Sequence, residues 1–358
     1  MAPAPKPRKR VASTLAITSS NDKYAASASP FFAILVPISR HFSYEILLID
    51  TLNNTSIKID HDIPIDGREQ GGLLDIVSEN NIVWVTCSIQ KGRKYTTAVY
   101  RAELQNNKLI NEKLIYEALP YIDNGKHFGS RIEILDDYLY VSVGERGKGM
   151  IAQDFTNSIG SIIRIHKNGE YPKDNPFIKG NNWLPELFQI GVRNPQGMTL
   201  DPQTKTIYIS NHGPKGGDEI NIIVAGGNYG WPLVSHGFEY GTDDKVSEHD
   251  SLPGFNDPEW VWIPSIAPSG MDFYPMNSGE KVMFPNLQGS LLVGSLKFRR
   301  LYSISINKDG LPESESILID GTLGRIRDVA IAKDGSILIL NDESSLSKPE
   351  GGLYRIFR

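Results

Sequence analysis

The chain has 358 residues and a formal net charge of −5, and 40% of its residues are hydrophobic, which is enough for a substantial core in one large or two ordinary domains. Its mildly acidic balance argues against a nucleic-acid binder, which needs a basic surface. No run of about 18 apolar residues exists that could span a membrane.

The chain begins with a basic stretch, PKPRKR, and we expect residues 1–25 to form a disordered, solvated tail. The apolar stretch that follows, FFAILVPI, is short, comes late and contains Pro37, so it is a poor secretory signal. Within the tail, ASTLAITSS could supply a first strand. We expect residues 26–358 to form a single catalytic domain.

One phrase then recurs: two short apolar runs joined by a tight turn and followed by a polar loop. In chain order it reads YEILLIDTLNNTSIKID, LLDIVSENNIVWVTCS, RIEILDDYLYVSVGERG, GMTLDPQTKTIYISNHG, FPNLQGSLLVGSLKF and DVAIAKDGSILILNDES, the first and fifth copies being degenerate. Such runs, bounded by turn residues, are typical of strands, so the chain is predicted to be all-β.

The turns of the clear copies fall near Asn80, Asp137, Gln203 and Asp334, spaced by about 60 residues or twice that. A unit of this length accommodates one four-stranded propeller blade with its loops. We therefore predict a six-bladed β-propeller whose first blade is incomplete or atypical; a pair of β-sandwiches is the competing architecture. In a propeller, equivalent loops meet at one end of the central channel, so the functional residues should lie there.

These loops carry four cations in an acidic protein. Arg193 lies in GVRNPQG, Lys297 in GSLKF, and Arg325 and Arg327 in GRIRDV, where a strand places both on one face. Taken singly, each can be a solvated surface residue, and His127 in HFGSR can be a structural histidine. Together, the cations suit a small polyanionic ligand, because arginine binds carboxylates bidentately.

The loop NHGPKGGDEIN, residues 211–221, is longer and more polar than a simple strand connection. Its Gly213 and Pro214 offer backbone carbonyls, which are hard oxygen ligands suited to Ca²⁺. Nearby Glu219 adds a carboxylate for a second ion.

Nine motifs together resemble the soluble PQQ-dependent glucose/sorbosone dehydrogenase family, and its aldose sugar dehydrogenase branch in particular. They are QGGLLD, HFGSR, GERG…AQD, GVRNPQG, HGPKGGDEIN, GGNYGWP, IAPSGM, GSLK and RIRDV, and they span residues from about 70 to 358. The resemblance implies a six-bladed propeller that binds pyrroloquinoline quinone (PQQ) and Ca²⁺. It also implies oxidation of the anomeric hydroxyl of an aldose to an aldonolactone, with hydride transfer to the quinone and onward transfer to an external electron acceptor.

The resemblance also implies residue roles. His127 matches the catalytic base, and Arg193 would stabilise the charge that develops. Gly213 and Pro214 match the carbonyl ligands of a catalytic calcium, while Glu219 and the Tyr229 carbonyl match a second, structural calcium. The positions that match cofactor contacts are Gln70, Arg193, Asn194, His212, Tyr240, Ser265, Lys297, Arg325 and Arg327.

Two features depart from the family pattern: the first 45 or so residues do not match, and Asn211 stands where relatives commonly have an acidic residue. Two other functions remain open, a calcium-dependent lactonase, which needs carboxylates around a central metal, and a non-catalytic binding module. No GxGxxG fingerprint follows a strand and opens a helix, which argues against a nicotinamide cofactor. The family resemblance implies a periplasmic or secreted location.

Overall fold

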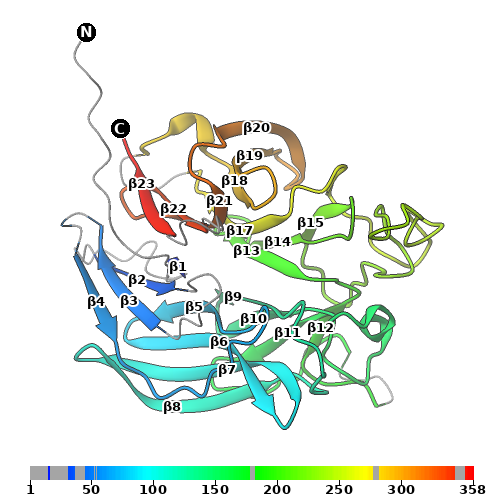
Figure 1. Cartoon of the computed structure of the whole chain (residues 1–358), viewed down its shortest axis with the longest axis horizontal. Coiled ribbons are helices and arrows are strands. Elements are labelled where there is room, and N and C mark those ends of the chain that lie inside the picture. The colour runs from blue at the N-terminus through cyan, green and yellow to red at the C-terminus, as the bar shows by residue number, and fades with distance from the viewer. Residues whose placement is uncertain are drawn as a thin grey trace.

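The computed structural model describes residues 15–16, 31–36, 45–51, 53, 55–177, 182–276, 282–342 and 351–358. This part of the chain is a β-propeller, in which six antiparallel sheets surround a central axis (Figure 1). The predicted all-β propeller class is therefore confirmed. Within the described ranges, no helix is long and apolar enough to cross a membrane.

The six sheets follow one another along the chain, and each begins at its innermost strand. The first comprises β1 (Leu15–Ala16), β2 (Phe31–Val36), β3 (Glu45–Asp50) and β4 (Thr55–Ile59). The second comprises β5 (Leu73–Glu79), β6 (Ile82–Lys91), β7 (Lys94–Gln105) and β8 (Lys108–Glu117), and the third β9 (Gly129–Leu135), β10 (Tyr138–Val143), β11 (Ser161–His166) and β12 (Leu187–Ile190).

The fourth sheet comprises β13 (Pro195–Asp201), β14 (Thr206–Asn211), β15 (Asp218–Ile222) and β16 (Trp260–Trp262). The fifth comprises β17 (Pro268–Tyr274), β18 (Ser290–Ser295), β19 (Arg300–Ile306) and β20 (Pro312–Asp320), and the last β21 (Arg325–Ile331), β22 (Ile337–Asp342) and β23 (Gly352–Ile356). Two short 3-10 helices, η1 (Gly149–Gln153) and η2 (Pro285–Leu287), lie in the connections.

The recurring phrases form hairpins where the sequence predicts them. The four clear copies form the first two strands of their sheets, with turns at the predicted places. Asn80 and Gly335 occupy left-handed backbone in two of these turns, with φ of 55° and 79°. Tight hairpins need this conformation, which asparagine and glycine adopt at low cost.

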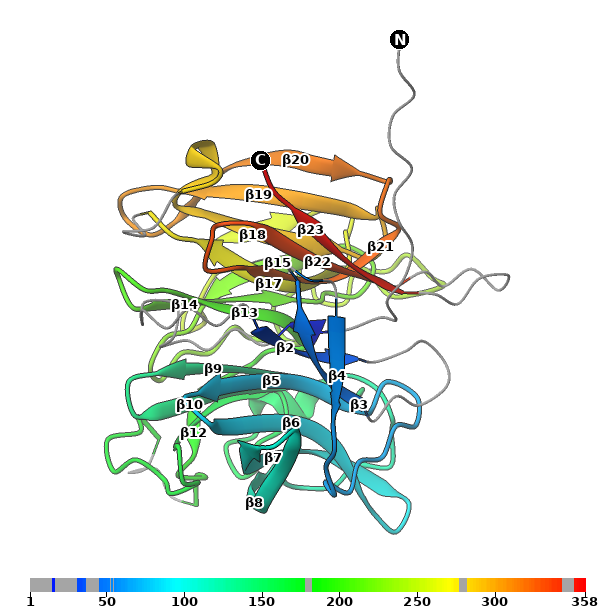
Figure 2. The same ribbon diagram turned by 90° about the vertical axis from the view of Figure 1, so that its left-hand side faces the viewer.

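The first sheet stands between the last sheet and the second sheet (Figure 2). Strand β1 contacts β21 and β22, and β2 contacts β5. Leu15–Ala16 pair with β2, so these two residues of ASTLAITSS belong to a sheet rather than to a tail; the rest of residues 1–25 lie outside the described ranges. The sheet with three described strands is the last one, not the first.

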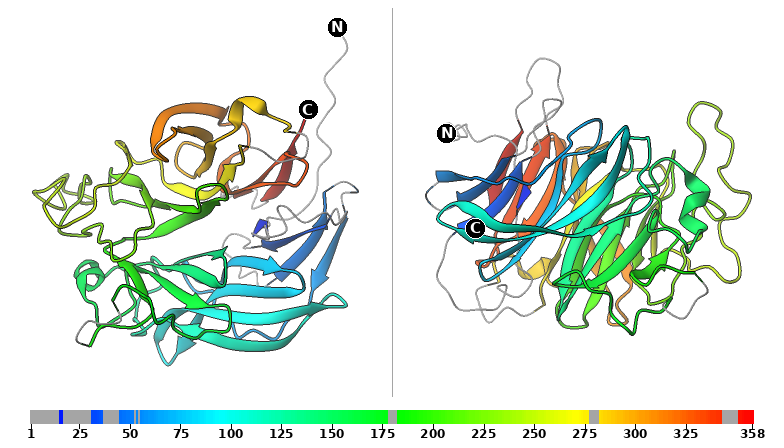
Figure 3. Two further views of the ribbon diagram at one scale, coloured as in Figure 1. Left: turned by 180° about the vertical axis from the view of Figure 1, so that it is seen from behind. Right: turned by 90° about the horizontal axis from the view of Figure 1, so that it is seen from below.

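The core lies between neighbouring sheets. For example, Val77 and Trp84 of the second sheet pack with Ile132, Val141 and Ile163 of the third. Because each sheet is covered on both faces, its strands are rich in aliphatic residues on both sides. The long connection between β15 and β16 projects from the outer side of the ring (Figure 3).

Candidate active site

The site is built where the innermost strands β5, β9, β13, β17 and β21 begin. Neighbouring sheets repeat the same strand order, so these strands run in one direction and their first residues lie at one end of the ring. Gln70, His127, Arg193, Asn194 and Ser265 precede innermost strands, Arg325 and Arg327 lie at the start of β21, and His212 and Lys297 follow second strands.

Strand pairing brings these loops together in pairs. The start of β13 pairs with the end of β14 through Pro195 and Asn211, and the start of β17 pairs with the end of β18 through Pro268 and Ser295. All five of these innermost strands show a register shift against their second strand. Such bulges redirect side chains at a sheet edge, which suits a site assembled at strand ends.

His127 lies directly before β9, and Glu145, which follows β10, holds its imidazole. Nδ1 of His127 donates a hydrogen bond to Oε1 of Glu145, whose Oε2 accepts the backbone N–H groups of Lys148 and Gly149. Burial opposes ionisation of Glu145, but the hydrogen bond and charge of His127 outweigh it and lower the pKa of the carboxyl. An ionised carboxylate only accepts, so the proton sits on Nδ1 and Nε2 is the basic nitrogen.

Gln70 and Asn194 hold the His127 loop, residues 124–130, from its two sides. Oε1 of Gln70 accepts the backbone N–H of His127 at 2.8 Å, and the backbone N–H of Gln70 donates to the carbonyl of Gly125 at 3.0 Å. Oδ1 of Asn194 accepts the N–H of Gly129 at 3.1 Å. Both predicted site residues therefore contact the loop that carries the predicted base.

Arg193 is a half-buried cation beside this loop. Its Nη1 donates to the carbonyl oxygen of His212 at 3.2 Å, and its guanidinium lies 5.3 Å from the ring centroid of Trp231. Among the described residues Arg193 forms no ion pair, and burial lowers its pKa. A partly desolvated guanidinium without a carboxylate partner favours an anionic ligand, because an uncompensated charge is costly to remove from water.

His212 remains neutral in this setting. Its Nε2 donates to the carbonyl oxygen of Pro268, and burial lowers its pKa to about 3, with the nearby charges of Arg193, His127 and Arg327 acting in the same direction. His212 is thus a poor base at neutral pH, whereas Nδ1 of His127 is bonded to the Glu145 carboxylate. The electrostatic contacts of His212 also place these four predicted residues in one neighbourhood.

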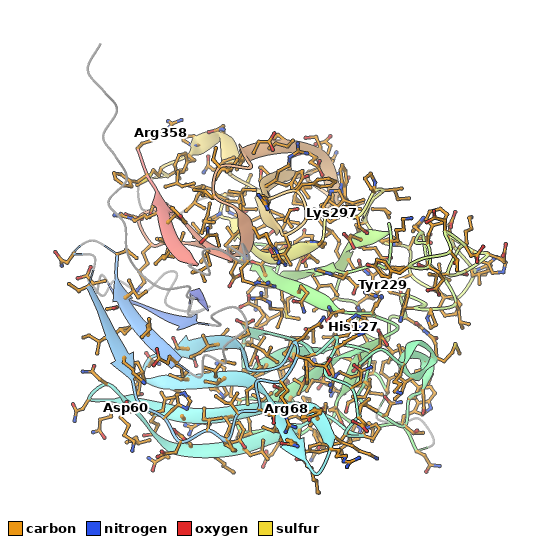
Figure 4. All side chains as sticks on the ribbon, viewed as in Figure 1. Asp60, Arg68, His127, Tyr229, Lys297 and Arg358 are labelled. Atoms are coloured by element: carbon orange, nitrogen blue, oxygen red, sulfur yellow. The ribbon has the colours of Figure 1, made fainter. Side chains whose placement is uncertain are left out.

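The remaining predicted residues lie around this group. Tyr240 is 70% exposed, yet close enough to Arg193 for their charges to interact. Lys297 is exposed and forms no ion pair within the described chain; its backbone N–H donates to the carbonyl of Ile266 at 3.2 Å. Figure 4 shows His127, Tyr229 and Lys297 toward the same side of the ring.

Arg325 and Arg327 are both half-buried and alternate with the buried residues Ile326 and Asp328. The register of β21 shifts between Ile326 and Asp328, at Arg327, so the shared face of Arg325 and Arg327 stays a prediction. The charge of Arg327 acts on the pKa of His212, so Arg327 lies in the neighbourhood of the site, and Arg325 is the first residue of the same strand, β21.

Asp218 fastens the loop that follows β14. Its carboxylate accepts the N–H of Gly213 at 2.9 Å and that of Ala267 at 2.7 Å, and burial raises its pKa to about 6. Oγ of Ser265 donates to the carbonyl of Pro214 at 3.2 Å. The hydroxyl of Ser265, predicted as a cofactor contact, therefore holds the Gly213–Pro214 turn against the loop before β17.

A second group of oxygens lies behind this turn; we call Glu219, Asn221, Tyr229 and Glu259 the Glu219 cluster. Nδ2 of Asn211 and Nδ2 of Asn221 each donate to Oε2 of Glu219 at 3.1 Å, and the Tyr229 hydroxyl donates to Oε1 of Glu259 at 3.2 Å. Burial raises the pKa of Glu219 and of Glu259 to about 7. Oδ1 of Asn221 is buried and has no hydrogen-bond partner among the described residues.

The sequence reasoning assigned no role to Glu145, Arg146 or Trp231. The sequence does contain a signal for Glu145 and Arg146. The motif GERG directly follows the second strand of the third sheet, and His212 and Lys297 follow the second strands of the fourth and fifth sheets. The contact of Trp231 with Arg193 joins the β15–β16 connection to the segment before β13, and no pattern in the sequence indicates that these two segments meet.

The structure defines a β-propeller that carries a carboxylate-bonded histidine and several cationic side chains at one end of its ring. The family model described as Glucose / Sorbosone dehydrogenase matches residues 44–354, and the chain belongs to this family of oxidoreductases. The resemblance drawn from the nine motifs is confirmed.

Individual relatives agree with this assignment. The chain is similar to aldose sugar dehydrogenase YliI of Escherichia coli (strain K12), with 37% identity over 287 residues, covering 77% of this chain and 76% of that protein. The crystal structure of the soluble aldose sugar dehydrogenase from Escherichia coli in the apo-form has a TM-score of 0.83 and 29% identity, covering 96% of this chain and 95% of that one. The PQQ-bound form of aldose sugar dehydrogenase from Streptomyces coelicolor shares the fold, with a TM-score of 0.74 and 21% identity over 97% of this chain and 94% of that one.

Proposed function

We propose that the chain is a PQQ- and calcium-dependent enzyme that oxidises the anomeric hydroxyl of aldose sugars to aldonolactones. The observation that carries the proposal is the proximity of His127, whose Nδ1 is bonded to Glu145, to Arg193, whose carbonyl accepts the backbone N–H of Glu145 at 2.8 Å and whose half-buried guanidinium forms no ion pair with the described residues. Similarity to a protein named aldose sugar dehydrogenase supports the substrate class. We further propose that the six sheets act as six blades of one catalytic domain that works outside the cytoplasm and passes electrons to an external acceptor.

The residues at the ring end suit PQQ, which carries three carboxylates and an ortho-quinone. Arg193 and Lys297 have no ion pair within the described chain, and Arg327 adds a third positive charge near His212. The residues that would hold the cofactor, directly or through the loops they support, are Gln70, Arg193, Asn194, His212, Tyr240, Ser265, Lys297, Arg325 and Arg327.

The oxygens also suit calcium at two places. The Gly213 and Pro214 carbonyls would serve a catalytic ion, since Asp218 and Ser265 fix the turn that presents them. The Glu219 cluster would hold a structural ion through Glu219 and the Tyr229 carbonyl. Oδ1 of Asn221, a buried acceptor with no donor in the described structure, would be a further ligand, because Ca²⁺ prefers carboxylate and amide oxygens.

In this mechanism PQQ would supply the hydride acceptor and Ca²⁺ a Lewis acid that polarises its quinone carbonyl. Nε2 of His127 takes the proton of the anomeric hydroxyl as the carbon–hydrogen bond breaks, and the sugar becomes the lactone. The Glu145 carboxylate stabilises the imidazolium that forms. Arg193 provides fixed positive charge where negative charge develops.

The test combines purified protein with PQQ and Ca²⁺ and follows reduction of an artificial electron acceptor with glucose, other aldoses and short oligosaccharides. We expect turnover that requires both additions. His127→Ala should abolish turnover while PQQ still binds, whereas His166→Ala, a histidine that contacts Tyr138 away from the site, should remain active. PQQ binding without turnover on any sugar would instead support the non-catalytic binding module.

The lactonase alternative is less well supported. Carboxylates do line the innermost strands, but Asp75 and Asp328 there contact Arg131 rather than converging around a metal position. Among the described residues, no three His, Cys, Asp or Glu side chains are grouped so as to hold a metal ion. A lactonase would hydrolyse lactones without PQQ, which the same preparation can test.

A further inference from the structure

Arg146, the residue after Glu145, has a fully buried side chain and contacts the His127 loop at several points. Its Nε donates to the carbonyl of Lys126 at 2.8 Å, Nη2 donates to the carbonyl of Asn124, and Nη1 donates to the carbonyl of Tyr95 on β7 at 3.0 Å. One guanidinium thus connects the residues before His127 to the neighbouring sheet.

The same guanidinium also contacts the residue after His127. Its central carbon lies 3.6 Å from the ring centroid of Phe128, which is close for a cation–π contact. The contacts of Arg146 therefore flank His127 on both sides along the chain, while Glu145 holds the imidazole itself.

The backbone of His127 needs such support. Its φ of +52° lies in the left-handed region, which costs a non-glycine residue energy and persists only where the surroundings enforce it. Gly144 makes room for this turn, because a Cβ there would lie 2.1 Å from the carbonyl oxygen of His127. A small displacement of the loop would consequently move the imidazole relative to Glu145.

We infer that Arg146 is a positioning residue for catalysis: by bonding the carbonyls of Asn124, Lys126 and Tyr95 and stacking on Phe128, it fixes the loop that presents His127. This inference rests on the proposed role of His127 as the base. Burial lowers the pKa of Arg146 to about 10, which shows how strongly the site desolvates a cation that carbonyls and an aromatic face compensate. Lysine cannot replace it, because an ammonium lacks the planar fork that reaches separate carbonyls.

The test compares Arg146→Lys and Arg146→Ala with Arg164→Lys in the full chain loaded with PQQ and Ca²⁺. Arg164 is a matched control, since it is also buried, stacks on Tyr138 and bonds Asn175, but lies on β11 outside the loop. We expect kcat of Arg146→Lys to fall about 10- to 100-fold, with KM and PQQ affinity nearly unchanged, because a displacement near 1 Å is enough for such a loss. Arg164→Lys should retain its kcat.

Chemical rescue with guanidinium distinguishes a positioning role of Arg146 in catalysis from a contribution to the stability of the fold alone. Added guanidinium, at concentrations that leave the wild type folded, should raise kcat of Arg146→Ala several-fold and have no effect on Arg164→Lys. If Arg146→Ala does not fold, the Lys variant decides alone. Full activity of Arg146→Lys while His127→Ala is inactive would overturn this inference only, whereas turnover by His127→Ala would overturn the assignment of the base.

Discussion

Glu145 bonds Nδ1 of His127 through one carboxylate oxygen and two backbone N–H groups through the other. Because the carboxylate only accepts hydrogen bonds, this arrangement places the proton of the neutral imidazole on Nδ1. It also means that the effect of changing Glu145 follows from hydrogen-bond chemistry rather than from lost packing.

Glu145→Gln should therefore reduce kcat by about 100- to 10,000-fold. The Lys148 and Gly149 N–H groups require an acceptor, so the amide oxygen of glutamine will face them and its NH₂ will face His127. The imidazole must then accept at Nδ1 and carry its proton on Nε2, which removes the base. Steady-state kinetics checks this; Glu79→Gln, which alters a carboxylate bonded to Lys167, is the control and should be unchanged.

Arg193→Met should lower the affinity for PQQ without lowering the stability of the fold. The guanidinium is half-buried and forms no ion pair with the described residues, so replacing it with an apolar side chain should leave the unfolding temperature of the PQQ-free protein unchanged or higher. PQQ affinity should fall at least about tenfold, because a charge-assisted contact is lost. Calorimetry without cofactor and PQQ titration measure the two effects. A large loss of stability with intact PQQ affinity would assign Arg193 a structural role.

Much of the fold could be predicted because it repeats. Hairpin turns depend on residues such as Asn80 that adopt left-handed backbone at low cost, and the repeated two-strand phrase shows how far apart these turns lie in the sequence. The first sheet was harder to predict from the sequence. Its innermost strand, Leu15–Ala16, is only two residues long and follows a basic stretch whose composition is typical of a disordered tail. No local pattern indicates that such a strand pairs with Phe31–Val36.

The site could be predicted in part because its residues occupy equivalent positions at the ends of the repeated strands. Loop position identified His127 and Arg193, but a partner such as Trp231 comes from the long β15–β16 connection, whose path depends on tertiary packing. Asn211 illustrates a departure that the structure explains: its Nδ2 donates to Glu219 while its Oδ1 accepts the N–H of Asn194 at 2.8 Å. An ionised acid could not donate to Glu219, so the amide suits this chain.

Calcium should stabilise the protein through the Glu219 cluster even without PQQ. Ca²⁺ at about 100 times its dissociation constant should add about 2.7 kcal/mol to the free energy of unfolding. Glu219→Gln should lose this gain, because the site loses its charged ligand, and Asn221→Leu should weaken it. Thermal unfolding with Ca²⁺ or with a chelator measures the gain; Asn175→Leu, which removes a buried but fully bonded amide, should keep it. An equal gain in all variants would place the stabilising ion elsewhere.

The centre of the ring should make stability depend on pH through Asp75. Nη1 of Arg131 lies 3.4 Å from Oδ2 of Asp328 and 3.8 Å from Oδ2 of Asp75. Burial raises the pKa of Asp75 to about 6, the charge of Asp328 adds to the rise, and the charge of Arg131 only partly offsets it. The folded protein therefore holds this proton more tightly than the unfolded chain, in which an aspartate titrates near pH 4.

A group with a raised acid pKa destabilises the fold when it ionises. The contribution of Asp75 to the free energy of unfolding should fall by about 3 kcal/mol as the pH rises from about 4 to about 6, and stay constant above that. Asp75→Asn cannot ionise, so the difference between wild type and variant should shift by that amount in favour of the variant over this range. Urea unfolding at several pH values checks this, with the exposed Asp136→Asn as control. Parallel curves for wild type and Asp75→Asn would mean that Asp75 stays ionised throughout, with Arg131 fully compensating its charge.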